Sequence, residues 1–250
     1  MRSKLFQLIF LSSAFIFSAC LQEQQTSDLA TLMEISPGIV EGYLTKDELP
    51  NSLKLLDPPP EVGSAAFNLD QEMAAKYLTV EEGRKKQAAK DAVLAFPEAA
   101  DAFNMVLDVK ISLENTPHLY ILLRRTLADA GLSTYAAKNN YQRSRPFMIN
   151  NERICTPEEE EHLRKDGSYP SGHTAIGWAW ALILTEVFPE KTDVILERGK
   201  QFGISRNICN VHWYSDVIAG RMMGAATVAR LHANPVFLAD LAVAKKEVTH

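Results

Sequence analysis

A histidine and an aspartate in the last quarter of the chain have a spacing that suits nucleophilic or proton-transfer chemistry. His212 and Asp216 are four positions apart, which places a carboxylate one turn from an imidazole in a helix. Asp216 can then accept a hydrogen bond from Nδ1–H of His212, and the unprotonated Nε2 is directed outward as a nucleophile or a base. The same spacing could hold a metal ion, but no cysteine lies beside it in a ligand motif and basic residues would repel a cation.

Basic residues that could converge on one anion form a second feature. Lys138 and Arg145 are seven positions apart, which is about 700° of helix rotation and within about 20° of two full turns. On one helix they would share a face, about 10 Å apart along the axis. Arg206 follows Ser205 at the end of a later predicted helix. The spacing of Lys138 and Arg145 alone is equally compatible with a solvated pair.

A third feature is the turn Pro170-Ser171-Gly172-His173, which lies directly before an apolar helical run. A helix start presents free backbone N–H groups and the positive end of the helix dipole, and both favour an anion. Gly172 removes a side chain where the backbone must approach a ligand closely. The alternative is an ordinary surface helix start with an incidental His173.

Helical patterns predict the elements that position these residues. No segment shows the alternation typical of a strand, so we predict one all-α domain over residues 51–250, preceded by an irregular segment, 21–50. Pro146 disfavours a helical conformation at Arg145. The first predicted helix begins near Asn68. The next spans 92–113 and has Pro97 near its start. Further helices are predicted over 117–144, 174–187, 191–206 and 213–233.

The segment that begins at Thr156 has the signals of a helix start. Thr156 is the expected N-cap, Pro157 is at the first helical position, and Glu159 completes a capping box. The run of four acids from Glu158 could also suggest a metal site. Helix-start chemistry accounts for these acids, so we predict no metal there.

Composition limits the classes of function. Hydrophobic residues make up 46% of the 250 and charged residues 23%, which is typical of a globular protein and not of a disordered chain. Lys and Arg total 26 against 31 Asp and Glu, so the net charge is −5. A protein that coats nucleic acid usually carries a basic excess, so no nucleic-acid polymer is expected as a partner.

The first twenty residues have the pattern of a targeting segment. Arg2 and Lys4 precede an apolar run, 5–17, which is short for a membrane span and typical of a signal peptide over 1–20. A retained anchor helix is the alternative. Ser18 and Ala19 before Cys20 resemble a bacterial lipobox, which would make Cys20 a lipidated N-terminus; ordinary export is the other possibility. Removing this segment leaves 24 basic and 31 acidic residues, a net charge of −7.

Two cysteines remain in the mature chain, Cys155 and Cys209. In an oxidising compartment they could pair, or they could be two separate buried thiols. No second apolar run approaches 18 residues, so contact with a membrane is expected only through a lipid on Cys20.

Taken together, the three motifs resemble those of the acid phosphatase and vanadium haloperoxidase superfamily. The blocks are Lys138 to Arg145-Pro146, then 170–173, then Ser205-Arg206 to His212 and Asp216. From about Leu55 to the C-terminus the chain is similar to bacterial class A non-specific acid phosphatases. The runs that carry this likeness are 55–64, 167–174, Ile208-Cys209 and His212-Trp213, whereas Asn210 and Val211 stand where a glycine and an aromatic are expected.

This resemblance implies an exported, metal-independent acid phosphatase with an all-α fold, no cofactor and broad activity on small phosphomonoesters. It implies that His212 forms a phosphohistidine, that Asp216 fixes its tautomer, and that His173 protonates the leaving group and then activates water. The expected phosphate-binding residues are Lys138, Arg145, Ser171, Gly172 and Arg206. It also implies a disulfide between Cys155 and Cys209, a periplasmic or envelope location, and a homo-oligomer.

Three alternatives use the same residues. Vanadium haloperoxidases hold vanadate with this motif, but they generally belong to longer chains. Lipid phosphatases share the three blocks but embed them among membrane helices, which the sequence after residue 20 does not contain. A non-catalytic envelope lipoprotein that binds phosphate would not need both histidines and Asp216.

Overall fold

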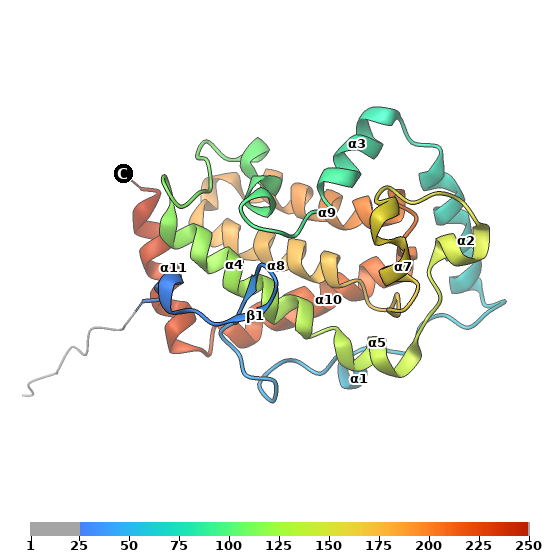
Figure 1. The fold of residues 1–250 in the computed structure, drawn as a ribbon, viewed down its shortest axis with the longest axis horizontal. Coiled ribbons are helices and arrows are strands. Elements are labelled where there is room, and N and C mark those ends of the chain that lie inside the picture. The colour runs from blue at the N-terminus through green and yellow to red at the C-terminus, as the bar shows by residue number, and fades with distance from the viewer. Residues whose placement is uncertain (1–25, 250) are drawn as a thin grey trace, which may run out of the picture.

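Helices form most of the structure, a computed structural model that describes residues 26–249. The α-helices in this part are α1 (Ser52–Leu55), α2 (Ala65–Leu78), α3 (Glu82–Lys90), α4 (Pro117–Leu132), α5 (Tyr135–Tyr141), α6 (Pro146–Asn150), α7 (Glu160–Leu163), α8 (Gly172–Val187), α9 (Thr192–Ile208), α10 (Tyr214–Leu231) and α11 (Pro235–Glu247) (Figure 1). The predicted all-α fold is confirmed. The predicted signal peptide, 1–20, and Cys20 lie outside the described residues.

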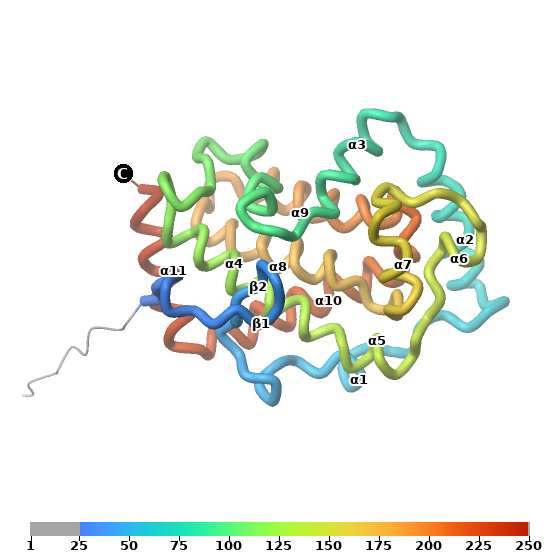
Figure 2. The backbone as a smooth tube through the Cα atoms, viewed as in Figure 1, coloured from blue at the N-terminus to red at the C-terminus, as the bar shows by residue number. Residues whose placement is uncertain are grey.

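Helix α8 is the central element of the core. It packs against α4, α9 and α10, and the tube view shows the four running through the middle of the molecule (Figure 2). Its sequence is apolar around most of its circumference, and such a helix is stable only when it is buried on most sides. Trp180, Ile183 and Leu184 accordingly lie in the main hydrophobic cluster, where Phe202 of α9 and Leu119 of α4 meet them.

Two glycines allow α10 to approach α8 closely. A Cβ atom on Gly220 would lie 2.5 Å from the Ser171 carbonyl oxygen, and one on Gly224 would lie 2.5 Å from the Ala175 carbonyl oxygen. Real Cβ atoms do not approach backbone this closely. The glycines therefore set the distance between α10 and the first turns of α8.

The N-terminal segment is more ordered than the sequence predicts. Residues 21–50 are expected to be irregular, but the described part contains an antiparallel hairpin of β1 (Glu34–Ser36) and β2 (Ile39–Val40). Pro37 and Gly38 form its two-residue turn, and Gly38 has φ +78°. Strands of two and three residues are too short to show an alternating pattern, which explains why the sequence does not reveal them.

The predicted helix over 92–113 is wrong. This segment contains only the 3-10 turns Glu98–Ala102 and Asn104–Val106. The side chain of Asn104 accepts a hydrogen bond from the backbone N–H of Ile111 and donates one to Asp101. Such local side-chain bonds compete with helix formation. The apolar residues of the segment, including Phe103 and Ile111, are nevertheless buried in the core.

The predicted helix from Pro117 to about residue 144 is two helices. It is interrupted after α4 because the hydroxyls of Ser133 and Thr134 donate to the carbonyls of Ala130 and Gly131. The helix α5 then ends at Gln142, which has φ +43°.

Two further segments differ from the sequence prediction or extend it. The predicted capping box at Thr156 is wrong, because its hydroxyl bonds the Glu159 carboxylate and residues 157–159 form a 3-10 turn before α7. Helix α11 is not predicted, although Asn234 caps it by accepting hydrogen bonds from two backbone N–H groups. Between residues 26 and 249, no helix has the length and apolarity needed to cross a membrane.

Candidate active site

The imidazole of His212 lies between a carboxylate and a guanidinium. Its Nδ1 is 3.3 Å from Asp216 Oδ2, and its Nε2 is 3.1 Å from Arg145 Nη1. An arginine can only donate and an ionised carboxylate can only accept, so His212 carries its proton on Nδ1 and its lone pair on Nε2. His212 lies just before α10, and Asp216 accepts a 2.8 Å hydrogen bond from the backbone N–H of Trp213 in the first turn. The helix start therefore holds the carboxylate that orients the imidazole.

Arg145 and Lys138 lie close together, but not in the arrangement that their spacing predicts. They do not share a helix face, because α5 ends before Arg145, which is the extended N-cap of α6. Asp166 joins them instead: its Oδ2 lies 3.0 Å from Lys138 Nζ and 3.0 Å from Arg145 Nη2. Both basic side chains are buried.

Arg206 is a fully buried cation on α9. None of its three guanidinium nitrogens has a hydrogen-bond partner within the described part of the protein. A buried charge without a partner is strongly unfavourable, and arginine suits planar recognition of phosphate. This orphaned guanidinium indicates an anion site.

The N-terminus of α8 supplies backbone donors to the site. Ser171 caps the helix by accepting a hydrogen bond from the N–H of Thr174, and its own N–H donates to the Asp216 carbonyl at 3.0 Å. Ser171 is thus occupied within the protein. The N–H groups of Gly172 and His173 make no hydrogen bond among residues 26–249, and both residues line the cavity described below.

His173 is held by a backbone carbonyl outside the three sequence blocks. Its Nε2 lies 2.9 Å from the carbonyl oxygen of Ala92, just after α3. Because a carbonyl only accepts, Nε2 carries a proton. The nitrogen that can exchange a proton with a substrate is therefore Nδ1.

A cavity of about 490 Å³ brings most of these residues together. It is lined by Lys138, Arg145, Gly172, His173 and His212 among the predicted residues. Asp216 lies behind His212, and Arg206 and Ser171 are buried without lining the cavity. Its apolar wall includes Ile35 and Ile39 of the N-terminal hairpin, Leu94 and Ile176.

Burial and mutual repulsion of the cations control protonation in the site. Burial, followed by Arg145, lowers the pKa of Lys138 to about 8, and burial lowers the pKa of Arg206 to about 10. The pKa of His212 is well below its ordinary value because of burial and then Arg145, and burial and Arg206 do the same to His173. Both imidazoles are therefore neutral in the free protein at neutral pH.

Sequence reasoning missed the residue that holds Asp216. Arg143 donates to Asp216 Oδ1 at 2.6 Å and to Asp70 of α2 at 2.7 Å, and its guanidinium also bonds Ser215. Burial raises the pKa of Asp216, and Arg143 opposes this shift. Arg143 lies within the first block, two positions before Arg145, but nothing in the spacing identifies its partner.

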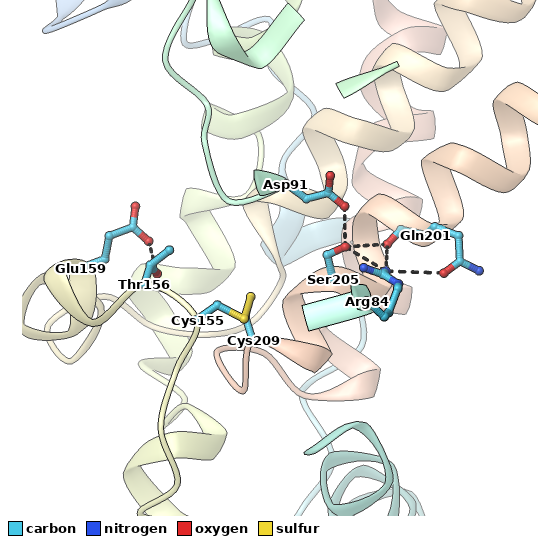
Figure 3. Close-up of a disulfide and its surroundings, with 8 residues drawn as sticks. All are labelled: Arg84, Asp91, Cys155, Thr156, Glu159, Gln201, Ser205 and Cys209. Atoms are coloured by element: carbon cyan, nitrogen blue, oxygen red, sulfur yellow. Dashed lines mark hydrogen bonds between the residues drawn. A yellow bond between two sulfur atoms is a disulfide. The ribbon is translucent and has the colours of Figure 1, made fainter. Parts of the chain in front are cut away.

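Figure 3 shows a disulfide and, near it, a polar network around Ser205, the residue that precedes Arg206 of the site. Cys155, in the loop after α6, is bonded to Cys209, which follows α9. Next to it, Asp91 accepts hydrogen bonds from Arg198 and from Ser205, the neighbour of Arg206. Asp91 also precedes Ala92, so the network fixes the carbonyl that holds His173.

The position of Asn210 explains one departure from the expected motif. Asn210 has φ +60°, a conformation in which glycine is most readily accepted and asparagine is tolerated. Its side chain bonds that of Asn150 and the carbonyl of Glu152. The turn before His212 is thus kept without the glycine.

Comparison with known proteins places the chain among phosphatases. Residues 119–237 match the PAP2 superfamily. A non-specific acid phosphatase from Providencia stuartii is 47% identical over 207 residues, 82% of this chain and 84% of the relative. One from Salmonella typhimurium is 42% identical over 211 residues, 84% of each chain. The crystal structure of a bacterial vanadium-dependent iodoperoxidase is similar at a TM-score of 0.49 with 14% identity, covering 86% of this chain and 63% of that one.

Proposed function

Because the chain belongs to the non-specific acid phosphatases of the PAP2 superfamily, class A, we propose that it hydrolyses phosphomonoesters through a phosphohistidine at His212. The observation that carries this mechanism is the pair of contacts on the His212 ring. Asp216 faces Nδ1 and Arg145 faces Nε2, so the free base is the nitrogen that meets the cations of the cavity. A neutral imidazole with that lone pair is a competent nucleophile toward phosphorus.

In the first step, Nε2 of His212 attacks phosphorus and the bond from phosphorus to the ester oxygen breaks. Arg206, Lys138 and Arg145 neutralise the equatorial oxygens, and the N–H groups of Gly172 and His173 add donors at the positive end of α8. Their fixed positions stabilise the charge of the transition state without reorganisation. These three cations supply the charge that a metal ion provides in other phosphatases, so we propose metal-independent catalysis.

In the free protein Nδ1 of His173 carries no proton, because burial and then Arg206 lower the pKa of this histidine. The negative charge of the phosphoryl group raises that pKa when the substrate binds, so Nδ1 takes up a proton from the solvent and donates it to the leaving oxygen as the bond to phosphorus breaks. In the second step, Nδ1 removes a proton from water, the resulting hydroxide attacks phosphorus, and the bond from phosphorus to Nε2 breaks. His212 returns to its starting tautomer, which Asp216 stabilises.

Export is part of the proposal. The disulfide between Cys155 and Cys209 fits an oxidising compartment, in agreement with the targeting pattern of residues 1–20. We propose a periplasmic or envelope location, with lipidation of Cys20 as one form of it.

The test is phosphate release from p-nitrophenyl phosphate and from alkyl phosphates by the purified protein, with and without a chelator. We expect His212→Ala to lower kcat by more than about a thousandfold, because a lost nucleophile costs several powers of ten. His232→Ala, which changes a histidine bonded to Glu186, is the matched control and keeps wild-type activity. His173→Ala should impair alkyl phosphates more than p-nitrophenyl phosphate.

Retention of more than about a hundredth of the wild-type kcat by His212→Ala would contradict the nucleophile assignment. Loss of wild-type activity on adding a chelator would contradict metal independence. Bromide oxidation with vanadate and peroxide, without phosphate release, would show that the protein is a haloperoxidase and not a phosphatase.

A further inference from the structure

The carboxylate of Asp166 lies where two of the phosphate-binding cations meet. A single oxygen, Oδ2, is 3.0 Å from both Lys138 Nζ and Arg145 Nη2. The Asp166 side chain is 24% exposed and lines the cavity. An oxygen shared by an ammonium and a guanidinium is the arrangement that a phosphoryl oxygen would adopt between the same two groups.

Arg145 has little remaining capacity for a substrate while Asp166 is bound. Its Nε donates to the carbonyls of Leu163 and Asp166, and its Nη1 faces Val211 O and His212 Nε2. Its Nη2 is the nitrogen that bonds the Asp166 carboxylate. A phosphoryl group that reaches His212 must therefore compete with this carboxylate for Arg145.

We propose that Asp166 is an internal competitor for the phosphate subsite. Its carboxylate holds Lys138 and Arg145 in the free enzyme and is displaced when a phosphoryl group binds. This inference rests on the proposed phosphatase function. It assigns Asp166 a role in setting the affinity for phosphate, separate from the chemical step.

The local structure suits a displacement of the side chain alone. The backbone beside Asp166 is fixed, because a Cβ on Gly167 would lie 2.8 Å from the Lys138 carbonyl oxygen. The Asp166 carboxylate is partly exposed, so water can solvate it when it leaves the two cations. A phosphate dianion has more charge and more acceptor oxygens than one carboxylate, and it also gains Arg206, so it wins the competition.

Competition of this kind favours release of the product. Three buried cations and a helix N-terminus would bind inorganic phosphate tightly, and tight product binding slows turnover. The Asp166 carboxylate replaces the departing phosphate at two of these cations. It thereby weakens the binding of both product and substrate.

The test compares Asp166→Asn with Glu159→Gln. Glu159 also lines the cavity and its charge acts on Arg206, but its carboxylate bonds Thr156, so its substitution removes a nearby charge without freeing Lys138 or Arg145. For Asp166→Asn we expect the inhibition constant for inorganic phosphate and the KM for p-nitrophenyl phosphate to fall about tenfold, with kcat unchanged or lowered by slower release of the product. Glu159→Gln should change each constant less than about threefold.

A higher KM or an unchanged inhibition constant in Asp166→Asn would overturn the proposal and make Asp166 a support for Lys138. Equal falls of these constants in both variants would also overturn the proposal, because the effect would then come from a general change of the electrostatic potential in the cavity. Asp166→Ser, which also removes the carboxylate, provides a second measurement and should show the same tighter phosphate binding. Failure of the wild-type protein to release phosphate would contradict the proposed function instead.

Discussion

At the scale of single residues, the site is organised around charges that are taken out of water. Lys138, Arg145 and Arg206 are all buried, and burial lowers the pKa of each. Charges of the same sign in close proximity repel, so the cluster is stable only with anionic partners. Asp166 contacts Lys138 and Arg145, and Asp216 contacts His212 beside them.

One contribution to the pH dependence of activity above neutral pH comes from Lys138. A lysine whose pKa is lowered to about 8 is charged below that pH and neutral above it, so phosphate binding weakens as the pH rises through about 8. We expect kcat/KM for p-nitrophenyl phosphate to fall there. Lys138→Arg should move this alkaline limb upward, because arginine stays protonated.

Lys165→Arg is the matched control, since Lys165 is exposed and pairs with Glu161. Its alkaline limb should coincide with that of the wild type. An unchanged limb in Lys138→Arg would show that another group titrates near pH 8.

The sequence predicts which residues gather but not how they contact one another. The spacing of Lys138 and Arg145 suggests a shared helix face, whereas the chain turns after α5 and Asp166 joins them. Arg143 escapes detection because its partners, Asp70 and Asp216, are distant in the chain. A motif records residue types, and long-range pairing depends on packing.

At the scale of elements, the predicted helices near the site agree best with the structure. The predictions 174–187, 191–206 and 213–233 differ from α8, α9 and α10 by about two residues or fewer at each end. These helices are long and buried, so their patterns are strong. The failures, at 92–113 and at Ser133, occur where side-chain hydrogen bonds replace helical ones.

The contact between α10 and the first turn of α8 is tested by Gly220→Ala. The added Cβ would meet the Ser171 carbonyl oxygen at 2.5 Å, so the turn that leads into α8 must move. We expect a loss of about 1–3 kcal/mol in the free energy of unfolding, as for other overpacked sites, and a lower kcat. Urea unfolding and phosphate release measure the two effects.

Gly83→Ala is the control, because a Cβ at Gly83 in α3 meets nothing within 4 Å. It should be neutral or stabilise the protein by up to about 1 kcal/mol. Equal behaviour of the two variants would show that the close approach of α10 and α8 is unimportant.

At the scale of the whole molecule, buried carboxylates tie the N-terminal segment to the helices. Asp129 of α4 accepts hydrogen bonds from the backbone N–H groups of Tyr43 and Leu44, and Asp240 of α11 bonds Ser27 and Tyr43. This segment carries the hairpin that lines the cavity. Its attachment depends on partners more than 80 residues away in the chain, so the local sequence pattern does not reveal its order.

The disulfide connects two parts of the chain that frame the site. It closes a loop between residues separated by 54 positions, for which chain-entropy models give a stabilisation of about 4 kcal/mol. We expect Cys155→Ala with Cys209→Ala to lower the free energy of unfolding by roughly that amount, measured in urea. A reductant should destabilise the wild type and leave the double variant unchanged; equal midpoints for the two proteins would contradict this role.

The unpaired guanidinium of Arg206 links the stability of the protein to the phosphate concentration around it. Folding leaves this charge without a hydrogen-bond partner among the described residues, so a bound oxyanion that pairs with it stabilises the folded protein. Mass action then links folding to the supply of phosphate, by about 2.7 kcal/mol when the anion is present at a hundred times its Kd. The same ion that limits turnover as a product would protect the enzyme from unfolding and proteolysis. A phosphate-rich environment would thus preserve an idle enzyme, and phosphate starvation would leave the enzyme at its most active and its least durable.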